Sequence, residues 1–126
     1  MASMQPTEHA LKYTWRVTGP HANQPGSGRI VVIGIGGAGN NTVTRLMEAG
    51  ITSAECIAVN TDAVHLQASK ANQKILIGEK LTKGLGVGGD PKLGRAAFEE
   101  SRKLIEELLT NVDIAFITAG LGGGTG

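Results

Sequence analysis

An apolar stretch that ends in closely spaced glycines constrains this chain most. Residues 31–41 read V-V-I-G-I-G-G-A-G-N-N, with Gly34, Gly36 and Gly39 in the spacing G-x-G-x-x-G. This pattern is typical of a buried strand, a tight turn and the N-terminus of a phosphate-binding helix. Glycine suits such a turn because it adopts positive φ and because a Cβ would hold the backbone away from an anion. We expect both properties at Gly39.

The composition is that of one domain with an aliphatic core. The chain has 126 residues, of which 40% are hydrophobic and 3% aromatic, and its net charge is +1. That charge gives no electrostatic reason to expect a nucleic-acid partner, and no apolar run approaches the roughly 20 residues of a membrane span. Cys56 lies alone in an apolar run, which predicts a buried, inert thiol. We therefore expect a cytoplasmic protein without direct membrane insertion.

Strand and helix patterns alternate after a tail of different composition. Residues 1–28 contain three prolines and end in G-S-G, which predicts a flexible N-terminal tail. Beyond it, continuous apolar runs predict strands, and helical periodicity predicts the segments between them. The predicted strands are 29–35, 55–60, 74–77 and 113–118, and the predicted helices are 39–49, 62–72 and 90–110. This order predicts an α/β fold, a Rossmann-like parallel sheet with helices on both faces.

Local signals refine the predicted helices. Gly50 is expected to end the first helix, and Asp90-Pro91 is expected to begin the last. Val64 and Leu66 are expected to face the core from the short second helix. Glu99 and Lys103 are spaced for an i,i+4 ion pair on the last helix.

Glycine-rich segments gather where such a sheet binds ligands, beyond the carboxyl ends of its strands. They cover residues 34–41, 84–91 and 119–126. A dinucleotide site would need one such turn and an acidic residue about 20 positions later, near Asn60 and Asp62, so a NAD-binding module stays an alternative. A triphosphate, with more charge, better explains several loops of backbone N–H donors. The lysine-containing P-loop pattern is absent, so amides, helix dipoles and a metal would neutralise the phosphates.

Five polar side chains lie in or beside these loops. Asp62 either caps a helix or reaches a metal, and Asp90 is expected to be a helix cap. Asn60 is expected to orient its own loop, and His65 to lie on the surface. Thr125 could donate its hydroxyl to a phosphate. We identify no catalytic residue and no metal-ligand cluster.

Four stretches together resemble FtsZ, the tubulin-related GTPases of bacterial and archaeal cell division. They are G-I-G-G-A-G-N-N at 34–41, A-V-N-T-D at 58–62, G-L-G-V-G-G-D-P at 84–91 and A-G-L-G-G-G-T-G at 119–126. The last resembles the specific signature loop of the tubulin family, and the first is closer to archaeal members. The resemblance implies GTP and GDP binding, Mg²⁺, head-to-tail protofilaments and a cytokinetic ring at the division site. It also implies division proteins that tether the polymer to the membrane.

The resemblance also implies which residues contact the nucleotide. Those residues are Gly36, Gly37, Ala38, Gly39, Asn40, Asn41, Asn60, Asp62, Gly88, Gly89, Gly122, Gly123, Gly124, Thr125 and Gly126. Two positions depart from the family, which usually has Ala and Asn where this chain has Val87 and Asp90. Extra bulk and a negative charge at these positions would lie near the γ-phosphate.

The family's ribose and guanine contacts, and its water-activating acidic loop, lie beyond the matched stretch. We therefore expect residues 29–126 to be the N-terminal part of a GTP-binding domain, ending in the signature loop, with no GTP hydrolysis of its own. A non-catalytic polymer cap or inhibitor is a further alternative. The resemblance places strand 113–118 beside the first strand, so we expect an open apolar edge and self-association.

Overall fold

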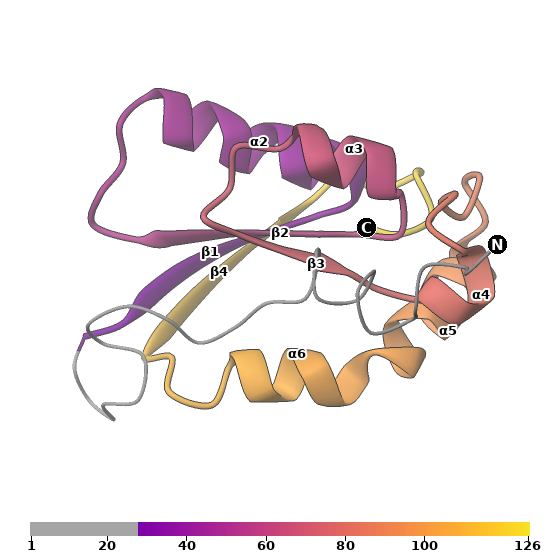
Figure 1. Ribbon diagram of the computed structural model, residues 1–126. Helices are drawn as coiled ribbons and strands as arrows, with labels where there is room; N and C mark the ends of the chain where they lie inside the picture. The colour runs from indigo at the N-terminus through magenta and orange to yellow at the C-terminus, as the bar shows by residue number, and fades with distance from the viewer. Residues whose placement is uncertain (1–27) are drawn as a thin grey trace, which may run out of the picture.

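Within residues 28–126, four parallel strands form a single sheet in the order β3-β2-β1-β4. The computed structural model describes residues 28–126, and the tail predicted over residues 1–28 lies almost wholly outside the described residues. The strands are β1 (Ile30–Ile35), β2 (Glu55–Asn60), β3 (Gln73–Leu76) and β4 (Ile114–Ala119). The helices are α2 (Gly36–Glu48), α3 (Ala63–Ala68), α4 (Glu79–Thr82), α5 (Pro91–Glu100) and α6 (Arg102–Leu108) (Figure 1).

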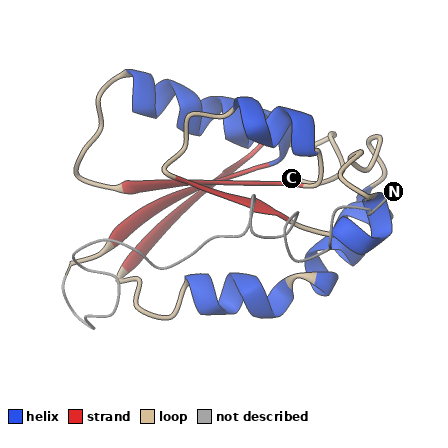
Figure 2. Ribbon diagram, viewed as in Figure 1, coloured by secondary structure: helices blue, strands red, loops and turns tan. Residues whose placement is uncertain are grey.

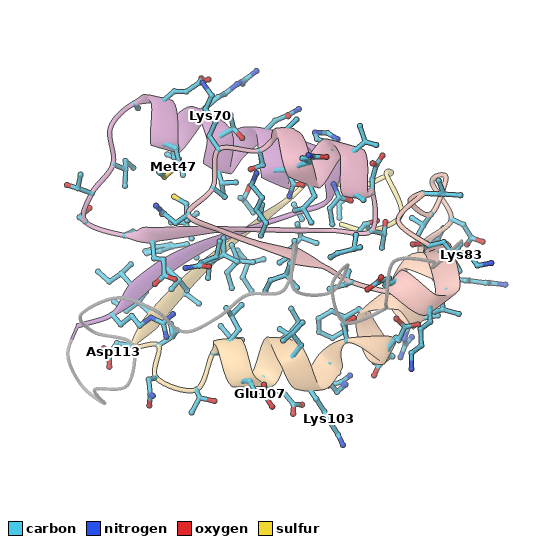
Figure 3. All side chains as sticks on the ribbon, viewed as in Figure 1. Met47, Lys70, Lys83, Lys103, Glu107 and Asp113 are labelled. Carbon is cyan, nitrogen blue, oxygen red and sulfur yellow. The ribbon has the colours of Figure 1, made fainter. Side chains whose placement is uncertain are left out.

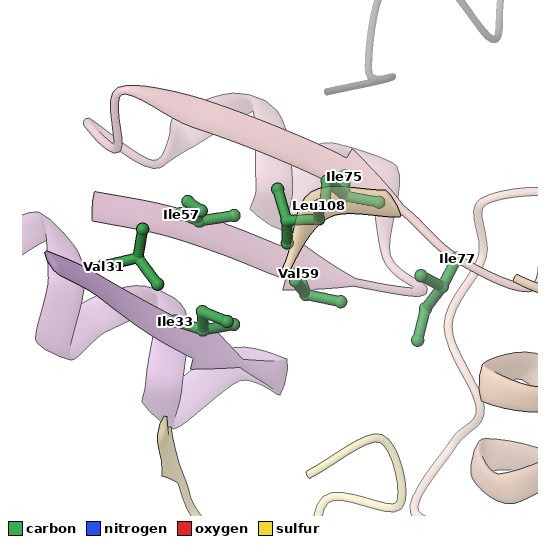
Figure 4. Close-up of a cluster of buried hydrophobic side chains, with 7 residues drawn as sticks. All are labelled: Val31, Ile33, Ile57, Val59, Ile75, Ile77 and Leu108. Carbon is green, nitrogen blue, oxygen red and sulfur yellow. The ribbon is translucent and has the colours of Figure 1, made fainter. Parts of the chain in front are cut away.

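Helices cover both faces of the sheet, as predicted. Figure 2 shows α2 and α3 over one face and α6 over the other, with α5 leading into it. One apolar cluster joins β1, β2 and β3 to Leu108 of α6, and Figure 4 shows Leu108 over Ile57 and Ile75. The second cluster packs Val43 of α2 and Leu66 of α3 against the opposite face. The inner strands are thus buried on both sides, which is why their sequences are continuously apolar.

The first helix begins earlier than predicted. α2 starts at Gly36, because a positive φ of 73° at that glycine completes the turn from β1 in one residue. Its end is as predicted. Gly50 has a φ of 82°, its N–H donates to the Met47 carbonyl, and the Ile51 N–H donates to the Leu46 carbonyl. These two bonds make a Schellman motif, which satisfies the last carbonyls of the helix.

The single helix predicted over 90–110 is two helices. α5 and α6 are separated at Ser101, whose Oγ accepts the N–H of Gly78 at 3.1 Å. At this bend Glu99 forms an ion pair with Arg102, three positions on, and not the predicted pair with Lys103. Arg102 binds Glu99 at 2.6 Å and lowers the pKa of that carboxyl, whereas Lys103 points away from the sheet (Figure 3).

The short helix α3 presents a different face to the core than predicted. Leu66 is fully buried, as expected, but Val64 is 79% exposed. The two residues are two positions apart, which is about 200° around an α-helix, so they cannot share a face. Ala63, one turn before Leu66, takes the inner position instead.

The outer edge of β4 is open and apolar among the described residues. Ile114, Phe116 and Ile117 are 49%, 58% and 64% exposed, and β4 is the last strand of the sheet. Unpaired backbone groups beside apolar side chains favour edge-to-edge association. We expect the purified 126-residue chain to sediment as oligomers or aggregates, and the variant Ile117→Lys to shift it toward monomer. Val64→Lys, at an exposed residue away from this edge, is the control. A wild-type chain that sediments as a monomer would contradict this prediction.

Candidate functional site

A cavity of about 420 Å³ lies at the carboxyl edge of the sheet. The loops that follow the strands converge there, near the end marked C in Figure 1. Its walls come from the start of α2, the segment between β2 and α3, the 85–89 loop and the final loop. The residues that line it are Gly36, Gly37, Ala38, Asn60, Thr61, Asp62, His65, Leu85, Gly86, Val87, Gly88, Gly89, Gly120, Leu121, Gly123, Thr125 and Gly126.

The N-terminus of α2 forms one wall of the cavity. Ile35 is its N-cap residue, no side chain caps the helix, and its first turn has no acidic residue. A helix of 13 residues carries a partial positive charge at this end, together with N–H groups that lack helical partners. Gly36, Gly37 and Ala38 all line the cavity. This wall is therefore suited to an anion.

Gly39 does not have the backbone conformation that its position in the motif suggested. Its φ is not positive, and it is buried instead of lining the cavity. A Cβ there would lie 2.6 Å from the Thr118 carbonyl oxygen, and one at Gly34 would overlap the Gly39 carbonyl. These glycines let α2 pack closely against β1 and β4. The expectation of positive φ at Gly39 is thus wrong, and Gly36 is the residue that has it.

Two asparagines fix the turn after β1 to the end of β2. Asn40 donates from Nδ2 to the carbonyl oxygens of Gly34 at 2.9 Å and Val59 at 3.1 Å. Its Oδ1 accepts the Nδ2 group of Asn60 at 2.9 Å, and the two residues are 1% and 3% exposed. Every polar atom of the Asn40 side chain is occupied in this way. Asn40 therefore positions the turn, and its side chain is not available to a ligand.

The segment after β2 is held by its own side chains. Asn60 Oδ1 accepts the N–H groups of Thr61 at 2.8 Å and Asp62 at 3.2 Å, which is the loop-orienting role expected of it. Asp62 Oδ1 accepts the His65 N–H at 3.0 Å, so Asp62 caps α3. Among the described residues, its carboxylate is the only acidic side chain in the lining.

The 85–89 loop is tied to this segment by backbone hydrogen bonds. The Ala63 N–H donates to the Gly84 carbonyl at 2.9 Å, and the Gly86 N–H donates to the Thr61 carbonyl at 3.1 Å. Gly84 and Gly86 both have positive φ, which the tight path requires. The loop thereby closes the cavity on the β2 side.

The two departures from the family pattern are accommodated locally. Val87 is buried, and its Cγ2 would lie 2.6 Å from a Cβ at Gly124, so its bulk packs between two loops. Asp90 Oδ1 accepts the N–H groups of Lys92 and Leu93, which makes it the cap of α5, as predicted. Asp90 does not line the cavity, and its charge faces the positive end of α5.

The final loop contributes Gly120, Leu121, Gly123, Thr125 and Gly126 to the lining. The Thr125 hydroxyl lies 2.8 Å from the hydroxyl of Thr61, which joins this loop to the segment after β2. Gly122 and Gly124 instead line an adjoining apolar hollow that includes Pro91 and Phe98.

Most of the predicted contact residues are brought together. Those outside the lining are Gly39, Asn40, Asn41, Gly122 and Gly124. The lining also includes residues that the sequence did not predict there, namely Thr61, Leu85, Gly86, Gly120 and Leu121, and His65, which was predicted to lie on the surface. His65 is half-buried, lines the cavity, and lies with Nε2 3.2 Å from Asn41 Oδ1. The sequence does indicate this position of His65, because His65 follows the predicted cap Asp62 by three residues and so lies at the same end of the helix.

The charge of the lining is low. Within residues 28–126, no lysine or arginine borders the cavity, and no group of three or more His, Cys, Asp or Glu could hold a metal ion. None of the helices within residues 28–126 is long and apolar enough to cross a membrane. Cys56 lies in the core, where burial, with the neighbouring Glu55 charge, raises the pKa of its thiol. Backbone groups must therefore carry most of any anion binding.

Known proteins match this chain closely in sequence. "Cell division protein FtsZ 2" of Methanocaldococcus jannaschii is 58% identical over 101 residues, which are 80% of this chain and 27% of that protein. "Cell division protein FtsZ 1" of Pyrococcus abyssi is 59% identical over 98 residues, 78% of this chain and 26% of the relative. The chain thus spans about a quarter of the length of these curated relatives.

Solved structures share the fold. A chain described as an empty FtsZ dimer from M. jannaschii superposes with a TM-score of 0.76 at 47% identity, over 98% of this chain and 34% of that one. CetZ2 from Haloferax volcanii, a GTPγS-bound protofilament, gives a TM-score of 0.68 at 33% identity, over 78% and 32%. The family model described as "Tubulin/FtsZ family, GTPase domain" matches residues 29–126. These matches confirm the resemblance carried by the stretches 34–41, 58–62, 84–91 and 119–126, and the chain belongs to the Tubulin/FtsZ family.

Proposed function

We propose that this chain binds GTP and GDP in the cavity at the carboxyl edge of the sheet, as part of an FtsZ-type cell-division GTPase. The observation that carries the proposal is the convergence of the uncapped α2 N-terminus with three backbone-rich loops around one cavity. Such N–H donors suit a multiply charged phosphate chain without lysine or arginine. The family match over residues 29–126 supports the guanine nucleotide as the ligand.

A dinucleotide fits the same geometry less well. The acidic residue that would bind a ribose is Asp62, and its Oδ1 is already used to cap α3. A pyrophosphate needs one glycine-rich turn, whereas the cavity here is bordered by several loops. No observation favours a non-catalytic polymer cap. These points support a guanine nucleotide over NAD.

Mg²⁺ and self-association complete the proposal. Mg²⁺ neutralises phosphate charge when bound. Phosphate oxygens and water would supply its ligands, because the described lining offers a single carboxylate, that of Asp62, which already caps a helix.

Structures of an FtsZ dimer and of a CetZ2 protofilament support head-to-tail polymerisation. We propose that the polymer assembles in the cytoplasm as a ring at the division site. Its partners there are membrane-tethering division proteins.

The ligand preference is testable by titration. We expect the 126-residue chain to bind GTP in the presence of Mg²⁺ more tightly than NAD, because only the triphosphate engages all the loops. Isothermal titration calorimetry with GTP, GDP and NAD measures the affinities directly. Tighter binding of NAD than of GTP would overturn the proposed function.

Hydrolysis by this chain alone is expected to be absent. Catalysis of phosphoryl transfer depends on positioned groups around the attacking water, and the one carboxylate in the lining is engaged as a helix cap. We expect phosphate release from GTP to equal that of the buffer over hours, measured with a coupled phosphate assay. Release above the buffer, abolished by a cavity variant in the same preparation, would contradict the prediction.

A further inference from the structure

Ser101 and Glu100 hold α4, the helical turn that precedes the 85–89 loop, although neither residue borders the cavity. We propose that these two residues position the loop for nucleotide binding, because the cap that they supply to α4 fixes where the chain enters the cavity. The inference rests on the proposed function and adds to it two positioning residues that lie outside the cavity.

α4 is a single helical turn, which its local sequence alone does not stabilise. An isolated turn is unstable because fixing its backbone costs more free energy than its first hydrogen bonds contribute. The N-cap residue is Gly78, which has no side chain to accept an N–H group of the turn. At the other end, Lys83 has a positive φ of 54°, which strains a residue with a Cβ. Contacts from elsewhere in the fold must therefore stabilise α4.

The junction between α5 and α6 supplies these contacts. Ser101 Oγ accepts the N–H of Gly78 at 3.1 Å. Glu100 Oε2 accepts the N–H of Lys80, also at 3.1 Å. Side chains of a helix's own first turn usually satisfy N–H groups at these positions, whereas the acceptors here come from 23 and 20 positions later. Gly78 is buried, and a Cβ there would overlap Ala97 of α5, so α4 lies directly against the helix that carries its cap.

The capped turn leads directly into the cavity lining. The Leu85 N–H donates to the Thr82 carbonyl at 3.0 Å, so the first lining residue of the loop is bonded to the last residue of α4. α5 begins at the other end of the loop and reaches the junction at Ser101 after 10 residues. The Gly78–Ser101 bond thus closes a unit made of α4, the 85–89 loop and α5, at about 15 Å along α5 from the loop. A change at Ser101 therefore acts on the loop without touching the ligand.

Calorimetry with GTP tests the role of Ser101 in three variants of the 126-residue chain. Ser101→Ala leaves the buried N–H of Gly78 without its acceptor, and Ser101→Thr retains the hydroxyl. Thr110→Ala is the matched control, because it removes an exposed hydroxyl beyond the far end of α6. We expect the GTP affinity to fall about tenfold in Ser101→Ala, since an unsatisfied buried donor favours arrangements in which the loop leaves its position. Ser101→Thr should restore most of the affinity, and Thr110→Ala should leave it unchanged.

Glu100 gives an independent test, because its side chain is exposed and its removal leaves the core intact. We expect Glu100→Ala to lower the GTP affinity about threefold. Glu100→Gln should lower it less, because its amide oxygen still accepts the Lys80 N–H. Glu107→Ala removes an exposed carboxylate from α6, and as the control for charge it should bind GTP as the wild type does.

Hydrogen exchange, followed by mass spectrometry of peptides, separates positioning from general destabilisation. Without nucleotide, Ser101→Ala should speed exchange in residues 78–89 about tenfold, while β1 and β2 exchange as in the wild type. Saturating GTP should slow exchange in that segment again. A GTP affinity of Ser101→Ala within about twofold of wild type, or equal acceleration in β1, β2 and residues 78–89, overturns this inference while the proposed function stands. Failure of the wild-type chain to bind GTP overturns both.

Discussion

Gly123→Val is expected to abolish GTP binding while the fold stays intact. Gly123 lines the cavity, no heavy atom lies within 4 Å of the position that its Cβ would take, and its φ is not positive. Valine therefore fits without strain in the free protein, and its side chain fills space that the phosphates need. We expect the affinity to fall by about 100-fold or more, equivalent to about 2.7 kcal/mol.

Calorimetry with GTP measures the loss of affinity, and thermal unfolding by circular dichroism monitors the fold. Ser53→Val is the matched control. Ser53 is exposed between α2 and β2, at the amino end of the strands, whereas the cavity lies at their carboxyl ends. That variant should bind GTP as the wild type does. GTP affinity within a few-fold of wild type in Gly123→Val would mean that the final loop does not border the phosphates.

Gly39→Val, unlike Gly123→Val, is expected to prevent stable folding. A Cβ at Gly39 would lie 2.6 Å from the Thr118 carbonyl oxygen and 2.7 Å from the Gly34 carbonyl carbon, and both are backbone atoms that cannot rotate away. α2 would have to move away from β1 and β4 to accommodate it. Overpacking of this kind costs about 3 kcal/mol, a large share of the stability of a small domain.

The loss should appear as a melt that is shifted to lower temperature or is no longer cooperative, with reduced soluble yield. Gly123→Val serves as the control, because it makes the same chemical change at a glycine with open space around it. A Gly39→Val chain that melts like the wild type and fails only to bind GTP would return Gly39 to the ligand-facing role that its motif suggested.

Features set by near neighbours along the chain could be predicted from the sequence. β2 spans residues 55–60, as its apolar run predicted, and Asp90 caps α5. The caps and the Gly50 helix end follow from hydrogen bonds within a few residues, so their residue types are visible in a short window. The parallel sheet follows from the alternation of strands and helices, and the loops that line the cavity were indicated by the clustering of glycine.

Features that join distant parts of the chain were decided only by the tertiary structure. The break between α5 and α6 coincides with a bond from Gly78 to Ser101, 23 positions away, and the Asn40–Asn60 bond spans 20. His65 lines the cavity because α3 packs beside α2, where Asn41 lies within hydrogen-bond distance. The residues next to a side chain in the sequence do not show which distant residue it will form a hydrogen bond with. Hydrogen bonds and close packing across the fold therefore determine which glycine lines the cavity and which lets α2 pack against the sheet.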